Sequence, residues 1–506
     1  MAINWPWKKK EKPAKRMYAA AQSGRLFGDW VAQGTSADSE IKSSLPRVRN
    51  RSRQLLRDND YAKNAVRAIV NNVVGQGVNF QAQVKMQRGS KLDSKINEQI
   101  EREWCKWQRK QNCHAAGMLH FHDIERQIVE GLVRDGEILV RLVTSAMGDS
   151  KVPLSLEVIE PDMLDDQYSE VLRNGNKVKM GVERNQWGRP VAYWFFAAHP
   201  GDDGFQSLKE RTVQRVRIPA SEVHHLFIQE RASQTRGFPW LASTMIRMHQ
   251  LQGFEEAEVI SSRATASLMG FIESPDGEIP SDGVENGERV TDFQPGVFKY
   301  LAPGEKVNVP NMSRPGGTFD PFVRAMLRGV AAGIGISYES LSRDYSQTNY
   351  SSARQALVED RDQYRVLQWW LIRNFHEPIF EKWLDLAVLS GALNLKGYET
   401  NPDAYKVCRW MPRGWQWIDP AKEVQAYKEA VKAGFLTQAE VIAQSGGDIE
   451  EVFQARANEL ELAESLGLKF DTEVEEMEIG GGKDGKINEG NSKPKKDEKE
   501  PAEDDE

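Results

Sequence analysis

The chain has 506 residues, 40% hydrophobic and 28% charged, which is ordinary for a globular protein and long enough for roughly two to four domains. Its three cysteines, Cys105, Cys113 and Cys408, are an odd and sparse set, so a disulfide framework is not expected and a reducing compartment fits. No run of about 18 apolar residues occurs, so neither a membrane span nor a secretory signal is expected.

Charge is unevenly distributed along the chain. The net charge is −7, but the last 36 residues carry 14 acidic and 6 basic side chains, which leaves about +1 for the first 470. Residues 1–16 hold six basic groups against Glu11. The chain therefore has a basic head, a near-neutral body and an acidic tail. Such a body argues against a dedicated high-affinity DNA binder, which normally shows a basic excess.

The first part of the chain is predicted to be an arm followed by helices. Residues 1–50 are basic and then Gly/Ser-rich, which favours an extended arm. Apolar residues recur at helical spacing over 51–74, where Gly75 and Gly77 end the pattern. Two more helices are predicted at about 91–111 and 122–134.

The middle section changes to a strand pattern. Turns such as Asn174-Gly175 and residues 187–190 separate segments rich in β-branched and aromatic residues. The predicted strands are 137–143, 154–159, 178–182, 191–196 and 223–228. This section is expected to form an α+β domain with a mainly antiparallel sheet.

Two further helices flank a compact insertion. The first runs from about Pro239 to Ala266, with the proline near its first turn. Residues 273–317 are rich in Pro and Gly, and 298–301 and 306–309 are predicted to be small strands. The second helix, about 319–334, is rich in glycine and alanine.

The remaining elements are a loop and the C-terminal helices. A Ser/Tyr/Asn-rich loop at 337–352 precedes a long helix, about 353–388, which Pro378 should kink or divide. Asp419-Pro420 predicts the start of another helix, and two short helices extend to about 468. The acidic tail beyond is expected to be disordered.

Four features of the sequence contain residue types that occur in metal, cofactor or catalytic sites. The residues Cys105, Cys113, His114, His120 and His122 suit zinc, but their spacing lacks a C-x2-C pair. Residues 480–487 nearly match a phosphate-binding loop, but Ile487 replaces the Ser/Thr, and no strand or helix flanks it. We therefore expect no metal ion and no cofactor at either place.

The other two features also favour structural explanations. Gly329, Gly333 and Gly335 lie late in a helix rather than after a strand, so a dinucleotide fingerprint fails and close helix packing is favoured. Acid pairs such as 165–166 and 255–256 are expected by chance in a chain so rich in carboxylates. No catalytic motif is found, which favours a protein that is not an enzyme.

Several co-linear segments carry a family resemblance. They are Ala331-Ala-Gly-Ile-Gly-Ile-Ser-Tyr-Glu-Ser-Leu-Ser-Arg343, Asp344-Tyr-Ser, Asn349-Tyr-Ser-Ser-Ala-Arg354, and residues 56–64, 234–237 and 418–425. Together they resemble the lambda-type bacteriophage portal family, from about residue 50 to 468. The basic arm and the acidic tail depart from that family's pattern.

The resemblance implies a portal fold, α+β and mainly helical, with wing, stem, clip and crown regions. The implied boundaries are an arm at 1–50, a wing at 51–238, stem helices at 239–269 and 318–336, a clip at 270–317, a tunnel loop at 337–352, a long-helix region returning to the wing at 353–400, crown helices at 401–470 and a disordered tail at 471–506. Gly329, Gly333 and Gly335 would then pack stem helices closely within the ring.

The resemblance also implies the biological role. Subunits, usually about twelve, would form a ring at the unique vertex of a tailed-phage head, assembled in the host cytoplasm. Double-stranded DNA would pass through the ring, independently of sequence, during packaging and ejection. The implied protein partners are the terminase large subunit at the clip, a major capsid or scaffold protein, and a head-tail connector. No membrane is involved.

The resemblance places one loop at the DNA. Its residues are Arg343, Asp344, Tyr345, Ser346, Gln347, Thr348, Asn349 and Tyr350. The loop is polar and nearly uncharged, which suits sliding DNA because strong phosphate contacts add affinity and friction. A subunit-contact turn is the alternative for this loop. Arg343 and Arg354 would contact phosphates or pair with nearby carboxylates.

Two other classes of protein stay open at this point. One is a metal-dependent nuclease of the packaging machinery, which a metal assay and a plasmid-nicking assay would identify. The other is a head-assembly adaptor that forms no channel. Images of rings with a central hole would favour the portal over both.

Overall fold

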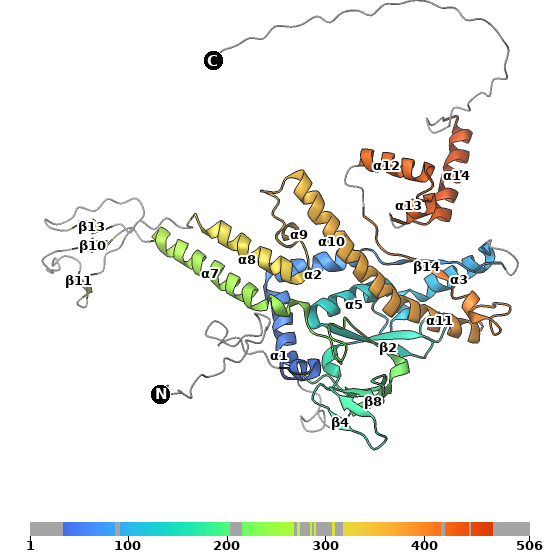
Figure 1. The fold of residues 1–506 in the computed structure, drawn as a ribbon, viewed down its shortest axis with the longest axis horizontal. Helices are drawn as coiled ribbons and strands as arrows, with labels where there is room; N and C mark the ends of the chain where they lie inside the picture. The colour runs from blue at the N-terminus through green and yellow to red at the C-terminus, as the bar shows by residue number, and fades with distance from the viewer. Residues whose placement is uncertain are drawn as a thin grey trace, which may run out of the picture. The chain divides into compact units, whose positions relative to one another are not determined.

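The computed structural model describes residues 34–86, 92–202, 215–267, 271–273, 284–285, 288–289, 306–308, 317–415, 420–444 and 447–468. Two compact units divide the chain, residues 1–448 and 449–506, and the second contains α14 (Ile449–Leu466). The first unit is mainly helical with small antiparallel sheets (Figure 1), which confirms the α+β prediction. Within the described ranges, no helix has the length and apolarity that a membrane crossing needs.

Three predicted features fall outside the described residues. They are residues 1–33 of the basic arm, most of the segment 270–317, including the predicted strand 298–301, and the tail beyond residue 468 with its glycine-rich stretch 480–487.

The described N-terminal part is helical. The extended arm predicted up to residue 50 is wrong from Ala37 onward, because α1 (Ala37–Asp58) begins there, capped by Ser36. Pro46 lies inside α1 and interrupts the sequence pattern that would have indicated a helix. The single helix predicted at 51–74 is divided at Asn59. The side chain of Asn59 accepts a hydrogen bond from the backbone of Ala62 (2.9 Å) and so caps α2 (Asp60–Val73).

The middle section contains two antiparallel sheets. One has the order β3-β2-β9, with β2 (Glu137–Val143), β3 (Ser155–Ile159) and β9 (Val223–Phe227). The other has five strands in sequential order: β4 (Glu170–Val171), β5 (Lys177–Lys179), β6 (Val182–Arg184), β7 (Pro190–Phe196) and β8 (Arg215–Pro219). The single strand predicted at 178–182 is instead a tight hairpin, because Met180 and Gly181 have φ of 47° and 81°.

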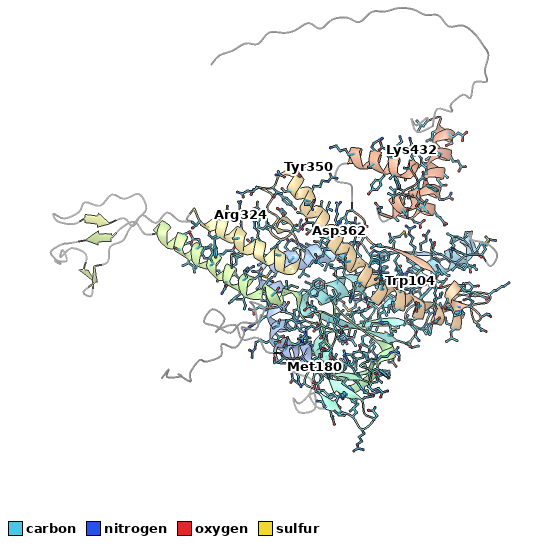
Figure 2. All side chains as sticks on the ribbon, in the orientation of Figure 1. Trp104, Met180, Arg324, Tyr350, Asp362 and Lys432 are labelled. Atoms are coloured by element: carbon cyan, nitrogen blue, oxygen red, sulfur yellow. The ribbon has the colours of Figure 1, made fainter. Side chains whose placement is uncertain are left out.

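An aromatic core joins helices that are distant in sequence. These helices are α3 (Ser94–Trp107), α5 (Phe121–Asp135) and α11 (Glu377–Leu389), with the short α4 (Lys110–Cys113) between the first two. The Trp104 ring centroid lies 4.8 Å from that of Trp107 and 5.0 Å from that of Trp383, and all three side chains are buried. Trp104 marks this core in Figure 2. Tryptophans thus serve as core residues here.

Two antiparallel helices, α7 (Met245–Ser267) and α8 (Phe319–Ile334), lie side by side (Figure 1). A 3-10 turn, Trp240–Ser243, follows Pro239, so the α-helix begins later than predicted. With 23 residues, α7 is about 34 Å long at roughly 1.5 Å per residue. Beyond α7, β10 (Phe271–Glu273) pairs with β13 (Lys306–Asn308), and β11 (Val284–Glu285) pairs with β12 (Glu288–Arg289).

The predicted long helix is present but interrupted. It consists of α10 (Tyr350–Leu371), a π-helical turn at Ile372–His376, and α11. Pro378 lies in the first turn of α11, where its missing N–H prevents a regular helical hydrogen bond. The kink or division expected at Pro378 is instead a π-helical turn, and the backbone stays helical from α10 into α11. The predicted loop 337–352 is only partly a loop, because it contains the short helix α9 (Tyr338–Ser342) and the start of α10.

The C-terminal part of the first unit returns to its beginning. Residues 408–411, predicted to belong to crown helices, instead form β14 (Cys408–Met411), which pairs with β1 (Asn79–Ala82). The part of the chain that packs with the N-terminal elements therefore extends past residue 400. The helices α12 (Pro420–Lys432) and α13 (Gln438–Gln444) follow, and α12 begins at Pro420, as predicted.

Candidate functional site between α9 and α10

The glycines of α8 have two different roles. A Cβ at Gly333 would overlap the methyl group of Thr244, and one at Gly329 would overlap the guanidinium of Arg247. Gly333 therefore allows α8 to approach the residues just before α7 closely within one chain, whereas the flexible end of Arg247 could move away from a side chain at position 329. Gly335 caps the C-terminus of α8 with a φ of 85°, a conformation that favours glycine. Packing of α8 between neighbouring subunits stays a prediction.

A nearly buried carboxylate, Asp360 of α10, holds the segment that follows α8. It accepts hydrogen bonds from the backbone N–H of Ser337 (2.8 Å) and from the hydroxyls of Ser337 (2.7 Å) and Ser340 (2.6 Å). Ser337 is also the N-cap of α9. Because the charged carboxylate accepts three hydrogen bonds, Asp360 fixes the position of the start of α9 relative to α10.

Arg343 ends α9 in a strained backbone conformation. Its φ of 60° lies in the left-handed region, which is uncommon for a residue with a Cβ. Its Nε lies 3.4 Å from the side-chain oxygen of Asn64 on α2. The amide of Asn64 donates in turn to the backbone carbonyls of Ser340 (2.9 Å) and Leu341 (2.8 Å). Arg343 therefore binds a neutral partner rather than a carboxylate.

Asp344 is held by donors on both sides of the loop. It accepts hydrogen bonds from the backbone of Ser346 (3.0 Å) and the hydroxyl of Tyr338 (2.9 Å). Hydrogen bonds from Ser346 and from Tyr338 lower the pKa of Asp344 to about 2. Arg324 of α8 lies 3.7 Å away, which adds a weaker attraction (Figure 2 places Arg324 on α8).

The second half of the loop is also hydrogen-bonded. Thr348 donates to Glu339 (3.2 Å), and Asn349 caps α10 by accepting from the backbone of Ser352 (2.8 Å). Gln347 and Thr348 line a small cavity of about 80 Å³. Tyr350, predicted as a loop residue, is the first residue of α10, at the helix end labelled in Figure 2.

Two tyrosines project from this framework. The exposed fractions of Tyr345 and Tyr350 are 57% and 63%, and both line a cavity of about 180 Å³ together with Arg354. The one cation and one anion of residues 343–350 cancel, so the loop offers aromatic and amide surface without net charge. A surface without net charge adds little of the electrostatic attraction that drives sequence-independent binding to a polyanion.

The cysteines and histidines weighed for zinc have separate roles in the structure. Cys105 is exposed, whereas the buried Cys113 donates to the carbonyl of Gln108 (3.2 Å). His120 caps α5, and His122 lies 3.2 Å from Glu125. His120 and His122 lie next to each other, with ring centroids 4.9 Å apart, and both are hydrogen-bonded to protein groups, as is Cys113.

Three residues that hold the loop were not singled out from the sequence: Asn64, Arg324 and Asp360. They lie on α2, α8 and α10, far apart in the sequence. The only available signal was that residues 56–64 and the loop both matched the same family. Helical spacing alone does not indicate which polar residue reaches across to another helix.

The sequence is similar to those of several known proteins. The family model described as phage portal protein, lambda family, matches residues 23–368. A probable portal protein of Halomonas phage phiHAP-1 is 29% identical over 469 residues, covering 91% of this chain and 89% of that protein. Portal protein B of Escherichia phage lambda is 23% identical, covering 88% and 89%.

Among solved structures, a chain in the virion of a native gene transfer agent particle has a TM-score of 0.42 and 14% sequence identity. It covers 83% of this chain and 98% of its own length. The family model covers more than half of the chain, including the loop and both helices beside it. This chain belongs to the lambda family of phage portal proteins.

Proposed function

We propose that the protein is a subunit of a ring that occupies the portal vertex of a tailed-phage head and conducts DNA. The observation that carries this proposal is the uncharged, hydrogen-bonded loop 343–349, which displays Tyr345 beside Tyr350 at the start of α10. Family membership supports the same role. Packaging by a terminase, ejection, and contacts to capsid or scaffold and connector proteins complete the proposed function.

We assign the regions as follows. Residues 34–238, the π turn with α11, and β14 form the wing; α7 and α8 form the stem; the segment between these two helices forms the clip; and the helices from α12 onward form the crown. Twelve helices of about 10 Å diameter, side by side in a ring, leave a bore of about 28 Å, wider than the roughly 20 Å of B-DNA. The glycines of α8 give the stem a compact cross-section.

The ring itself is tested by imaging. Negative-stain images of the purified protein should show rings with a central hole. Particles without a hole would contradict the channel and favour a head-assembly adaptor. A plasmid-nicking assay with Mg²⁺ distinguishes the portal from the nuclease alternative, for which cleavage would be the expected result.

The loop is tested by the double variant Tyr345→Gly and Asn349→Gly. Glycine is a tolerated N-cap that costs only a few tenths of a kcal/mol, so the fold and the ring should persist. We expect less packaged DNA or poorer retention of it, because the loop loses its aromatic and amide surface.

The matched control is Trp187→Gly. Trp187 is 84% exposed in the turn between β6 and β7, away from the loop. The control should package normally. Normal packaged DNA and normal infectious yield in the loop variant would refute the assignment of the loop to the channel.

A further inference from the structure

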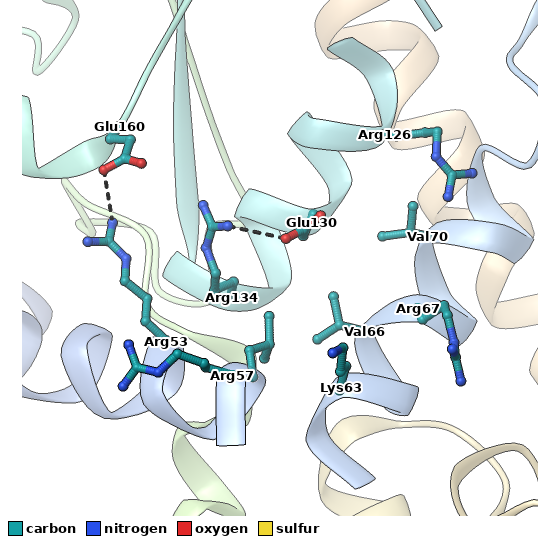
Figure 3. Close-up of a pocket in the computed structure, with 11 residues that line it drawn as sticks. Arg53, Arg57, Lys63, Val66, Arg67, Val70, Arg126, Glu130, Arg134 and Glu160 are labelled. Atoms are coloured by element: carbon teal, nitrogen blue, oxygen red, sulfur yellow. Dashed lines mark hydrogen bonds and ion pairs between the residues drawn. The ribbon is translucent and has the colours of Figure 1, made fainter. Parts of the chain in front are cut away.

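A cavity rich in cationic side chains lies between α1, α2 and α5, at a distance in sequence from the loop. It has a volume of about 520 Å³, within the range of roughly 300–1,000 Å³ that is usual for ligand sites. Figure 3 shows its lining, to which α1 contributes Arg53 and Arg57, α2 contributes Lys63 and Arg67, and α5 contributes Arg126 and Arg134. We call it the cationic cavity.

Helical spacing explains how each helix presents its cations together. Arg53 and Arg57 are four residues apart, as are Lys63 and Arg67, so each pair lies on one side of its helix. Arg126 and Arg134 are eight residues apart, with Glu130 between them. Among the described residues, the carboxylates of the lining are Glu130 and Glu160, so six cations against two anions give this part of the lining a net charge of +4.

Two of the six cations are neutralised inside the protein. Arg53 lies 2.7 Å from the buried carboxylate of Asp135, and Arg134 lies 2.9 Å from Asp135 and 3.2 Å from Glu130. Figure 3 shows the Arg134–Glu130 contact. These pairs belong to the structure of α1 and α5 and do not need a ligand.

The other four have weak or neutral partners. Arg126 donates to the backbone carbonyl of Gly75 (2.7 Å) and the side chain of Asn71 (3.0 Å), so its guanidinium is oriented but not neutralised. Arg67 donates to Asn64 (3.0 Å). Arg57 contacts only its neighbour Asp58, and within the described ranges Lys63 has no ion pair. Four cations therefore remain available to an anionic partner.

The cavity is connected to the candidate loop through one side chain. The oxygen of Asn64 accepts from Arg67 at the cavity (3.0 Å) and lies 3.4 Å from the Nε of Arg343 at the loop. Arg67 at the cavity and Arg343 at the loop thus share one acceptor on α2. The body of the protein is near neutral, so this concentration of charge is local.

We infer that the cationic cavity binds the phosphate backbone of double-stranded DNA, without reading bases. Guanidinium groups match phosphate oxygens in geometry, and a duplex presents one charge about every 1.7 Å of its axis, so several cations are satisfied at once. The choice of DNA over an acidic protein segment rests on the proposed function and on the connection to Arg343. This site supplements the uncharged loop and gives the protein a salt-sensitive hold on DNA.

The test measures binding of a fluorescent 30-bp duplex to the full chain by anisotropy as salt is varied. Each phosphate contact contributes about 0.9 to the slope of log affinity against log salt concentration. The double variant Lys63→Gln and Arg67→Gln should lower that slope by about 1.8. Between about 50 and 200 mM salt, the wild-type affinity should then fall roughly 12-fold further than that of the variant.

Both substituted side chains are exposed, so the variant should fold. A matched control removes the same charge elsewhere, with Arg102→Gln on α3 and Lys382→Gln on α11, and should keep the wild-type slope. Equal slopes for the variant and the wild type would overturn the inference. So would a variant that loses binding to poly-glutamate but not to the duplex, since the ligand would then be an acidic protein segment.

Oligomer size provides the last distinction. A variant that no longer forms the wild-type oligomer, with an unchanged duplex slope, would assign these cations to a subunit contact and overturn the inference. Binding of a short duplex does not require a bore. If no rings form but the salt slope changes as expected, the result would contradict the proposed function. It would still support DNA binding at the cationic cavity.

Discussion

The arginines of α1 differ in what lies opposite them. Arg49 is 1% exposed, and its Nη2 lies 2.7 Å from an oxygen of the buried Glu137 on β2. The side chain of Arg57, two turns later on the same helix, is 72% exposed, and its ion pair among the described residues is with its neighbour Asp58. Arg53, between them, is half-buried and pairs with Asp135. A row of identical residues thus passes from the interior to the cationic cavity.

Burial decides whether a charged side chain pairs with another group inside the fold or remains available to a partner. Around Glu137, two arginines and a histidine converge, because Arg236 lies 2.6 Å and His225 2.8 Å from its carboxylate. The backbone N–H of Gly237 also donates to it (2.8 Å). Every charge there has its partner inside the fold, as burial requires. In the cationic cavity, Arg57, Lys63 and Arg67 are exposed, and with Arg126 they remain available to a partner.

A second buried carboxylate, Glu125 on α5, sharpens the comparison. Its partners are two histidines, with His376 of the π turn at 2.8 Å and His122 at 3.2 Å. Glu137 is held by two arginines and a histidine, whereas both ion-pair partners of Glu125 are histidines. The two sites should therefore respond differently to mutation and to pH.

The largest expected effect is on stability, from Glu137→Gln. Burial alone would raise the pKa of Glu137, but the charges of Arg236 and Arg49 and the hydrogen bond to His225 hold it well below its ordinary value. Removing the charge leaves Arg236 buried without a counter-charge and leaves Arg49 only Asp162, at 3.7 Å, which should cost about 3–5 kcal/mol. Urea denaturation measures the loss.

The control for that variant is Glu130→Gln. Glu130 pairs with Arg134 across one helical turn at 3.2 Å, and both side chains are partly exposed. Its loss should change the free energy of unfolding by no more than about 0.5 kcal/mol. A loss of less than 1 kcal/mol or so in Glu137→Gln would show that the buried cations find water, and the contrast with the cavity would fail.

A smaller effect is expected from His122→Gln, and it should depend on pH. Burial disfavours the charged form of His122, but the hydrogen bond and charge of Glu125 outweigh it, so the pKa of His122 is raised. The stabilisation that charged His122 provides is therefore fully present below the ordinary pKa of about 6.5 and is lost as pH rises through the raised value.

The wild type should accordingly exceed the variant most at weakly acidic pH and lose that advantage towards alkaline pH. Glu125 keeps its charge there, because its two histidines lower its pKa despite burial. Denaturation series at several pH values measure the difference. A difference that grows with rising pH would contradict the direction of the shift.

Most of the fold was predictable because periodicity reports burial along one element. The helix at 319–334 and the strand at 137–143 were predicted with the bounds that the structure has. Errors occurred where a local residue masked the pattern, as Pro46 did in α1, or where a strand is exposed, as β8 is. Hairpin formation at Met180 was missed because a positive φ is rare for methionine.

The candidate site was predictable only in part, and for a physical reason. The family resemblance indicated the loop and the segment 234–237, and the structure explains the latter through Arg236 and Gly237, which bind Glu137. The cationic cavity was not predicted. Its cations recur at four-residue spacing, which equally describes a solvated helix face, and only the packing of α1, α2 and α5 brings them together.

The smallest effect on stability is expected from Arg57→Gln, at the exposed end of the α1 row. A substitution at an exposed position without a buried partner should change the free energy of unfolding by less than about 0.5 kcal/mol. The same change should lower the salt slope of duplex binding by about 0.9, because one phosphate contact is lost. Its counterpart Arg49→Gln should do the reverse and destabilise the fold by about 3–5 kcal/mol. If Arg57→Gln destabilises the protein and leaves the salt slope unchanged, then burial does not separate the two roles along α1.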